Sequence, residues 1–273
     1  PDSMSRHYPG PKFGRQGIRK LCGIEKGPIL MSALKPLGRS AKDFGETAYK
    51  LALGGCPLIK DDHSLFNQSY APFKDRVKAC VDSVNNANAK TGGRSLYIAN
   101  CTADSMEFLE RAMTAQELGA GGIMAAPGLL GLSIIRELSS APDFHLPIFI
   151  HPCFSGPLVL SADSGISPFC CYGQFSRLAG ADAAIFTSFG GRFPFTEEVC
   201  RKICDGTETE MGGLRSIFPV PSGGMKWQLF KKMVQVYGPD AIFLVGGALL
   251  TESDDLTANM HFYFEKLNEA VNK

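Results

Sequence analysis

The sequence predicts an α/β protein whose eight parallel strands close into a (β/α)8 barrel. Short, nearly all-apolar runs alternate eight times with longer amphipathic stretches. Such continuous apolar runs are typical of parallel strands that are buried on both faces. The alternation occupies most of the 273 residues, which is close to the length of one TIM barrel. No GxGxxG motif follows the first run and no P-loop sequence is present, so the sequence disfavours an open nucleotide-binding sheet.

The expected strands are the apolar runs themselves, and the expected helices follow them in strict alternation. We expect strands at Ile29–Leu34, Leu58–Asp61, Leu96–Asn100, Gly122–Ala125, Pro147–His151, Ala183–Thr187, Ile217–Pro221 and Ala241–Val245. We expect helices at Ala41–Leu53, Phe73–Lys90, Ser105–Leu118, Gly131–Ser139, Pro168–Leu178, Thr196–Cys204, Met225–Tyr237 and Leu256–Val271. This order implies right-handed crossovers between neighbouring parallel strands.

Local signals support several of these helices. Ser40 and Asp104 stand where N-caps are expected, and Thr196 precedes two glutamates that favour a helix start. Glycines end other helices, where a left-handed residue is usual: Gly54-Gly55, Gly92-Gly93, Gly119 and Gly180. Residues 1–28 are rich in proline and glycine, and we interpret them as a lead-in segment to a barrel of residues 29–273.

Composition limits the class of partner and the compartment. The formal net charge is +1, whereas a nucleic-acid or anionic-membrane surface needs an excess of positive charge, so we expect neither partner. No apolar run reaches the length of a membrane helix, and the polar N-terminus does not resemble a signal peptide. The nine cysteines form no CxxC pair, which indicates reduced thiols. We therefore expect a cytoplasmic protein.

Four ionisable residues follow the second expected strand directly, from Lys60 to His63. Because successive side chains on a strand point to opposite faces, Lys60 and Asp62 share the face that opens into the barrel, and Asp61 points away. Burial lowers the pKa of a lysine, and its neutral amine reacts with CO2 to give a carbamate, an anionic oxygen ligand. With Asp62, a carbamylated Lys60 forms a site suited to Mg²⁺, completed by waters and substrate.

His63 adds a nitrogen ligand in this interpretation and shifts the metal preference toward Mn²⁺, Fe²⁺ or Zn²⁺. The alternative is an ordinary Lys60–Asp62 pair at the end of a strand. The motif by itself leaves both interpretations open.

Glycine turns follow the last two expected strands, where barrels often hold a phosphate group. The first turn contains Ser222, Gly223 and Gly224, and the second contains Gly246 and Gly247. Glycines let backbone N–H groups approach an anion closely. Simple turn chemistry is the alternative, but two such turns at this pair of strands favour a phosphorylated ligand.

Three further residues close other strands. Lys35 follows the first strand and is suited to polarise a carbonyl, transfer a proton or hold a phosphate. His151 closes the fifth strand, at the rim where barrel enzymes place catalytic groups. Arg192 follows two glycines after the sixth strand and could reach a substrate anion from a mobile loop. The alternatives are that Lys35 is a solvated lysine, His151 a hydrogen-bonded core histidine and Arg192 a surface arginine.

Taken in order, these motifs resemble the C-terminal barrel domain of the ribulose-bisphosphate carboxylase (RuBisCO) superfamily over nearly the whole chain. The segments that carry the resemblance are Leu34–Gly38, Gly54–His63, Asn67–Phe73, Tyr97–Thr102, Pro221–Gly224 and Gly246-Gly247. The lead-in, from Gly10 to Arg19, is similar to the segment before the barrel in the RuBisCO-like proteins, the non-carboxylating branch.

The resemblance implies a metal site and also shows where this chain departs from it. In that family, the lysine at Lys60 is carbamylated and binds Mg²⁺ with the aspartate at Asp62 and a following glutamate, which is replaced here by His63. Lys35 matches the first lysine of the strand-one motif, whereas the second is Leu37.

Other departures concern the groups that carboxylases use to capture CO2 and hold a second phosphate. Pro152 replaces the arginine that follows the strand-five histidine, and Arg192 stands at the loop-six lysine. The resemblance therefore implies a RuBisCO-like enolase or isomerase, which moves a proton next to a carbonyl in a phosphorylated keto sugar such as a methylthioribulose phosphate. The alternatives are a decarboxylase of a 3-keto sugar-acid phosphate and a catalytically silent binding or structural homologue.

Family members carry an N-terminal domain before the barrel, which completes the active site of a neighbouring subunit. No such domain is recognisable in these 273 residues. The resemblance also implies a homodimer.

Overall fold

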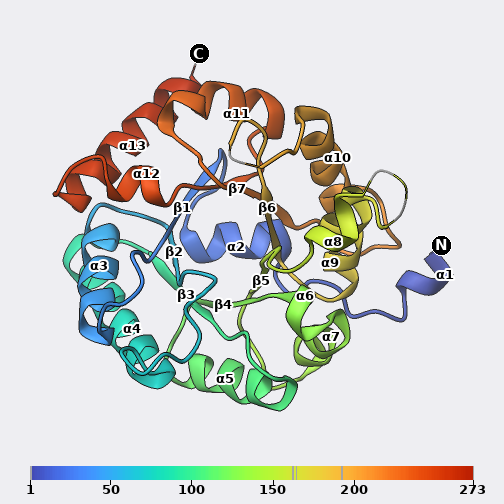
Figure 1. Ribbon diagram of the computed structural model, residues 1–273, viewed down its shortest axis with the longest axis horizontal. Helices are drawn as coiled ribbons and strands as arrows, with labels where there is room; N and C mark the ends of the chain where they lie inside the picture. The colour runs from blue at the N-terminus through green and yellow to red at the C-terminus, as the bar shows by residue number, and fades with distance from the viewer. Residues whose placement is uncertain (1, 162, 164, 192, 273) are drawn as a thin grey trace.

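The computed structural model describes residues 2–161, 163, 165–191 and 193–272. Its eight parallel strands form one sheet in the order β7-β6-β5-β4-β3-β2-β1-β8, and β7 lies beside β8, so that the sheet curls into a nearly closed barrel (Figure 1). The strands are β1 Ile29–Ala33, β2 Leu58–Lys60, β3 Leu96–Asn100, β4 Gly122–Ala125, β5 Ile148–Ile150, β6 Ala183–Thr187, β7 Phe218–Ser222 and β8 Ile242–Leu244. The predicted fold class is confirmed.

The helices surround the strands, except α2, which lies across the centre of the ring in this view (Figure 1). They are α1 Asp2–Ser5, α2 Gly14–Cys22, α3 Ala41–Leu53, α4 Phe73–Thr91, α5 Ser105–Glu117, α6 Pro127–Leu130, α7 Leu132–Ser140, α8 Gly156–Val159, α9 Phe175–Leu178, α10 Glu197–Glu208, α11 Phe230–Tyr237, α12 Gly247–Leu250 and α13 Leu256–Val271. Ser40 forms a capping box with Asp43, and the Thr196 side chain accepts the N–H of Val199, as their positions predicted. Asp104 is an N-cap residue without a side-chain hydrogen bond.

Three predicted helices differ in the structure from their expected form or bounds. The stretch expected as Pro168–Leu178 begins as a π-helix, η1 Phe169–Gln174, and α10 continues to Glu208, beyond the predicted end. The backbones of these two helices touch at their glycines, since a Cβ added at Gly173 would lie 2.5 Å from Gly206. Gly206 therefore serves close packing and does not end its helix. The stretch expected from Met225 starts as a short 3₁₀ turn, η2 Trp227–Leu229, ahead of α11.

Helix α2, within the segment expected as a lead-in, lies across the amino end of the barrel. Ile18 is fully buried and packs in one cluster with Ile29, Phe218 and Ile242. These three are the first residues of β1, β7 and β8. The buried Asp182 carboxylate accepts the N–H groups of Phe13 and Gly14 before α2 and that of Ile148 in β5. Apolar packing and these hydrogen bonds close the amino end of the barrel. The candidate functional residues lie at the carboxyl end.

Candidate active site

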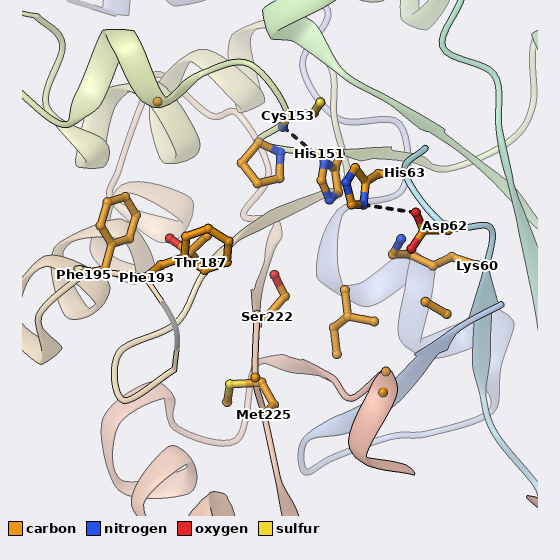
Figure 2. A pocket seen from close by; sticks show the side chains of 18 of the residues that line it. Lys60, Asp62, His63, His151, Cys153, Thr187, Phe193, Phe195, Ser222 and Met225 are labelled. Carbon is orange, nitrogen blue, oxygen red and sulfur yellow. Dashed lines mark hydrogen bonds and ion pairs between the residues drawn. The ribbon is translucent and has the colours of Figure 1, made fainter. Parts of the chain in front are cut away.

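A cavity of about 710 Å³ opens at the carboxyl ends of the strands (Figure 2). Its walls come from the residues that follow β1, β2, β5, β6, β7 and β8. It is therefore at the end of the barrel where (β/α)8 enzymes carry their active sites. All the described residues proposed from the sequence line it: Lys35, Lys60, Asp62, His63, His151, Ser222, Gly223, Gly224, Gly246 and Gly247. Arg192 lies outside the described residues.

Strand β2 positions Lys60 and Asp62 on the cavity side, as the alternation of side chains predicted. Lys60 is buried, with 2% of its surface exposed, and Asp62 is buried to a similar degree. Asp61 points the other way, into a layer between strands and helices, where it contacts Arg76 and the Tyr97 hydroxyl. Two adjacent aspartates at the end of β2 therefore face different regions: Asp62 faces the cavity and Asp61 faces the helices.

Lys35 forms an ion pair with Asp62, with 2.7 Å between Nζ and Oδ2. Burial alone raises the pKa of the Asp62 carboxyl, but Lys35, the Ser64 N–H and the positive charge of Lys60 outweigh burial and lower the pKa to about 2. Asp62 is therefore an anion at neutral pH. Asp62 is thus a buried carboxylate whose Oδ2 atom already faces one cation, Lys35, and such an anion is a suitable ligand for a metal cation.

The Lys60 amine is buried and its Nζ donates to the Asp61 carbonyl at 2.8 Å. Burial lowers the pKa of Lys60 to about 8, although the charges of Asp62 and Asp61 oppose the shift. At pH 7 about a tenth of the molecules then carries a neutral Lys60 amine. Such an amine is a nucleophile toward CO2, which is the property that carbamate formation requires.

His63 and His151 stack face to face, with ring centroids 4.5 Å apart and 7° between the planes (Figure 2). His63 Nδ1 lies 3.5 Å from Asp62 Oδ1. The Cys153 N–H donates to His151 Nδ1 at 3.1 Å. Burial, together with the charges of Lys60 and His63, lowers the pKa of His151 well below its ordinary value. His151 is thus neutral, and since Nδ1 accepts a hydrogen bond, its proton is on Nε2.

The glycine turns form the opposite part of the cavity, after β7 and β8. Gly223 and Gly224 have φ values of 91° and 88°, a left-handed conformation that other residues rarely adopt. A Cβ added at Gly247 would meet no atom within 4 Å, and one added at Gly246 would meet only Lys35 Cε, at 4.0 Å. Gly246 and Gly247 therefore leave open space beside Lys35, where an anion can approach the backbone.

The cavity also has an apolar wall, which the sequence did not indicate. It comes from the loops that follow β5, β6 and β7, and Figure 2 shows Phe193, Phe195 and Met225 on the side of the cavity away from Lys60. Phe154, Val159 and Leu160 complete it. These residues lie in irregular segments and short helices, so no period in the sequence marked them.

A divalent metal fits the donors that Lys60, Asp62 and His63 provide. Within the described part of the chain, no cluster of three or more His, Cys, Asp or Glu side chains is arranged to hold a metal ion. A third ligand must therefore come from another group, and Lys60, on the same strand face as Asp62, would supply one once carbamylated. The buried, anionic Asp62 carboxylate and the lowered pKa of Lys60 both agree with such a site.

The fold and this site define a class: (β/α)8 enzymes whose site lies at the carboxyl ends of the strands. The sequence matches the family described as ribulose bisphosphate carboxylase large chain, catalytic domain, over residues 14–259. The chain belongs to this family, as its motifs indicated. Family members generally use Mg²⁺ and a carbamylated lysine.

Three relatives illustrate the similarity. The 5-methylthioribulose-1-phosphate isomerase of Rhodospirillum rubrum is 36% identical over 94% of this chain and 67% of its own length. The 2,3-diketo-5-methylthiopentyl-1-phosphate enolase of Geobacillus thermodenitrificans is 36% identical over 91% of this chain and 60% of its own. The solved structure of a RuBisCO-like protein from Alicyclobacillus acidocaldarius superposes with a TM-score of 0.93 at 32% identity, over 100% of this chain and 68% of its own. The chain thus spans about two thirds of the length of these relatives.

Among the residues that the structure describes, no helix combines the length and apolar character that crossing a membrane requires.

Proposed function

We propose that this barrel catalyses metal-assisted enolisation of a phosphorylated keto sugar, of the kind named in its isomerase and enolase relatives, and that it does not fix CO2. The observation that carries the proposal is Lys35, which lies between two half-sites. Its ammonium pairs with Asp62 on the lysine–aspartate side, while its Cε atom is the neighbour of Gly246 on the glycine side. One small molecule with a carbonyl and a single phosphate matches this arrangement.

Different groups of pocket residues would bind different parts of that substrate. Backbone N–H groups at Ser222–Gly224 and Gly246-Gly247 would receive the phosphate, and Lys35 would neutralise part of its charge. The apolar wall of Phe193, Phe195 and Met225 faces the remainder of the substrate and excludes water. A substrate with an apolar substituent, such as the methylthio group in the relatives' substrates, fits this division.

Lys60, Asp62 and His63 would hold Mg²⁺ or Mn²⁺, with Lys60 as the carbamate. In carbamate formation the Lys60 nitrogen forms a bond to the CO2 carbon and releases a proton, so that a neutral amine becomes an anion. When bound, the metal acts as a Lewis acid that makes the carbon next to the substrate carbonyl more acidic.

Proton transfer needs a base and a group that stabilises the enolate oxygen. His151, which is neutral and carries its proton on Nε2, is suited to donate a hydrogen bond to that oxygen. Among the described pocket residues, the candidate base is a carbamate oxygen on Lys60, and Lys35, whose ammonium pairs with Asp62, is a candidate acid. We also propose that the protein acts as a homodimer, since members of its family assemble as dimers or octamers.

Deuterium exchange tests the proposal directly. The purified protein, with bicarbonate and Mg²⁺ or Mn²⁺ in D2O, is incubated with 5-methylthioribulose 1-phosphate and, separately, with 2,3-diketo-5-methylthiopentyl 1-phosphate. We expect metal-dependent deuterium incorporation next to the carbonyl of one of them, and no incorporation of labelled CO2 into ribulose bisphosphate. Absence of exchange with both compounds would refute the proposal, and CO2 release from a 3-keto sugar acid without exchange would replace it with the decarboxylase alternative.

A further inference from the structure

Asn100, the last residue of β3, lies buried under the loop that follows β2. Only 1% of its surface is exposed. Its Nδ2 atom lies 3.0 Å from the carbonyl oxygen of His63, 3.3 Å from that of Leu65 and 3.5 Å from that of Asp62. Its Oδ1 atom accepts the N–H of Thr102 at 3.2 Å. The Asn100 side chain therefore hydrogen-bonds to several backbone carbonyls of the segment that carries Asp62 and His63.

The loop between β2 and α4 depends on such contacts because it contains little regular structure. In the described chain it forms one isolated bridge, between Gln68 and Ala71. Buried carbonyl groups still need donors, and without a regular ladder the donors must be side chains. Arg76, fully buried at the start of α4, supplies those for Leu65, Phe66 and Ala71. Asn100 supplies them at the other end of the loop, next to the cavity.

The backbone N–H of Asn100 makes a second connection to the same segment. It donates to Asp61 Oδ2 at 2.9 Å, while the Tyr97 hydroxyl donates to Asp61 Oδ1 at 2.7 Å. The Asp61 side chain is thus fixed on the outer face of the barrel. The Asn100 carboxamide fixes the carbonyls that follow it. Asn100 thus contacts the Asp61 side chain on one side of Asp62 and holds the backbone carbonyls of Asp62 and the residues after it on the other.

We propose that Asn100 is a positioning residue for the metal site, which holds the backbone of Asp62 and His63 so that both side chains face Lys60. The inference rests on the proposed function, because it takes these residues as metal ligands. Asn100 acts through the loop, as the hydrogen-bonding partners of metal ligands do in other proteins, where their loss commonly weakens metal binding by 10–100-fold.

Substitution by aspartate removes the two donors with almost no change of shape. The acceptor for Thr102 stays, but an oxygen then faces the carbonyls of Asp62, His63 and Leu65, so the loop must move away. Asn100→Ala removes the donors without this repulsion and carries the test if Asn100→Asp does not fold.

Asn88 provides a matched control. Its side chain also binds backbone, since Nδ2 donates to the Ser95 carbonyl and Oδ1 accepts the Ser95 N–H, both at 2.9 Å. Ser95 directly precedes β3, at the amino end of the barrel and away from the cavity. Asn88→Asp therefore loses the same kind of hydrogen bond without touching the loop after β2.

Mn²⁺ titration followed by electron paramagnetic resonance, with bicarbonate present, compares the four proteins at a temperature where thermal unfolding shows each to be folded. We expect Asn100→Asp and Asn100→Ala to bind Mn²⁺ at least about tenfold more weakly than the wild type, and Asn88→Asp to bind it equally well. Wild-type affinity in both Asn100 variants would overturn the role of Asn100 alone. Failure of the wild type to bind Mn²⁺ would overturn the metal site itself, and the role of Asn100 with it.

Discussion

At the amino end of the barrel, Ile18, Phe218 and Ile242 fill the interior, and the buried charge of Asp182 is satisfied by three backbone N–H groups. At the carboxyl end, Lys60 and Asp62 face a cavity of about 710 Å³, and the charges of Asp62 and Asp61 do not fully offset the burial of the Lys60 amine, whose pKa is lowered to about 8. Burial of polar groups without full compensation costs stability, and enzymes commonly accept this cost at their active sites. Residues at the amino end therefore stabilise the fold, whereas residues at the carboxyl end form the candidate active site.

The largest effect is expected at Lys60. Lys60→Met replaces a buried amine by an apolar side chain of similar length. We expect at least about a 1,000-fold loss of metal-dependent deuterium exchange, because both the metal ligand and its charge are lost. Unfolding without metal should be unchanged or shifted to higher temperature, since an incompletely compensated buried charge is removed. Retention of a tenth of the exchange rate would show that Lys60 is not part of the catalytic site.

The opposite result is expected at Ile18, in α2. Ile18→Ala should lower the free energy of unfolding by about 2–5 kcal/mol, because it leaves a cavity in the packed end of the barrel. Chemical denaturation measures the loss, and Leu21→Ala, at a 36% exposed position of the same helix, is the control with a small effect. The Mn²⁺ affinity of folded Ile18→Ala should equal that of the wild type. A weaker affinity would mean that the two ends are coupled.

The pKa of Lys60, about 8, predicts how activation by CO2 depends on pH. Only the neutral amine reacts, so at fixed dissolved CO2 the rate of activation should rise about tenfold per pH unit up to roughly pH 8 and then level off. A lysine with an ordinary pKa would give a rate that continues to rise beyond pH 10. Activation rates measured between pH 6.5 and 9.5 distinguish the two, and a rise that does not level off near pH 8 would contradict the burial of the free amine.

The smallest effect is expected at Gly247, the first residue of α12. A Cβ there meets no atom of the described chain within 4 Å, so Gly247→Ala should leave thermal stability nearly unchanged. The added methyl group occupies the space assigned to phosphate, and we expect inorganic phosphate to bind several-fold more weakly. Calorimetric titration measures this, and unchanged phosphate affinity would place the phosphate elsewhere in the cavity.

Much of the fold was readable from local patterns. The ends of the eight apolar runs lie within one residue of the ends of the observed strands, because parallel strands buried on both faces are nearly all apolar. The side-chain period of two was also enough to place Lys60 and Asp62 on the cavity side and Asp61 on the other. The candidate site residues could be chosen because strand ends in a barrel share one rim.

Contacts between distant segments were not readable in this way. The pairing of Lys35 with Asp62, the stacking of His63 on His151 and the support of the β2 loop by Asn100 each join residues from different strands. The same holds for the contact between Gly173, in the π-helix Phe169–Gln174, and Gly206 in α10. The sequence by itself determined the order of the elements and the direction of their side chains, since both follow from short-range periodicity. Only the tertiary structure decided which side chains meet, because that depends on how the curved sheet brings strand ends together.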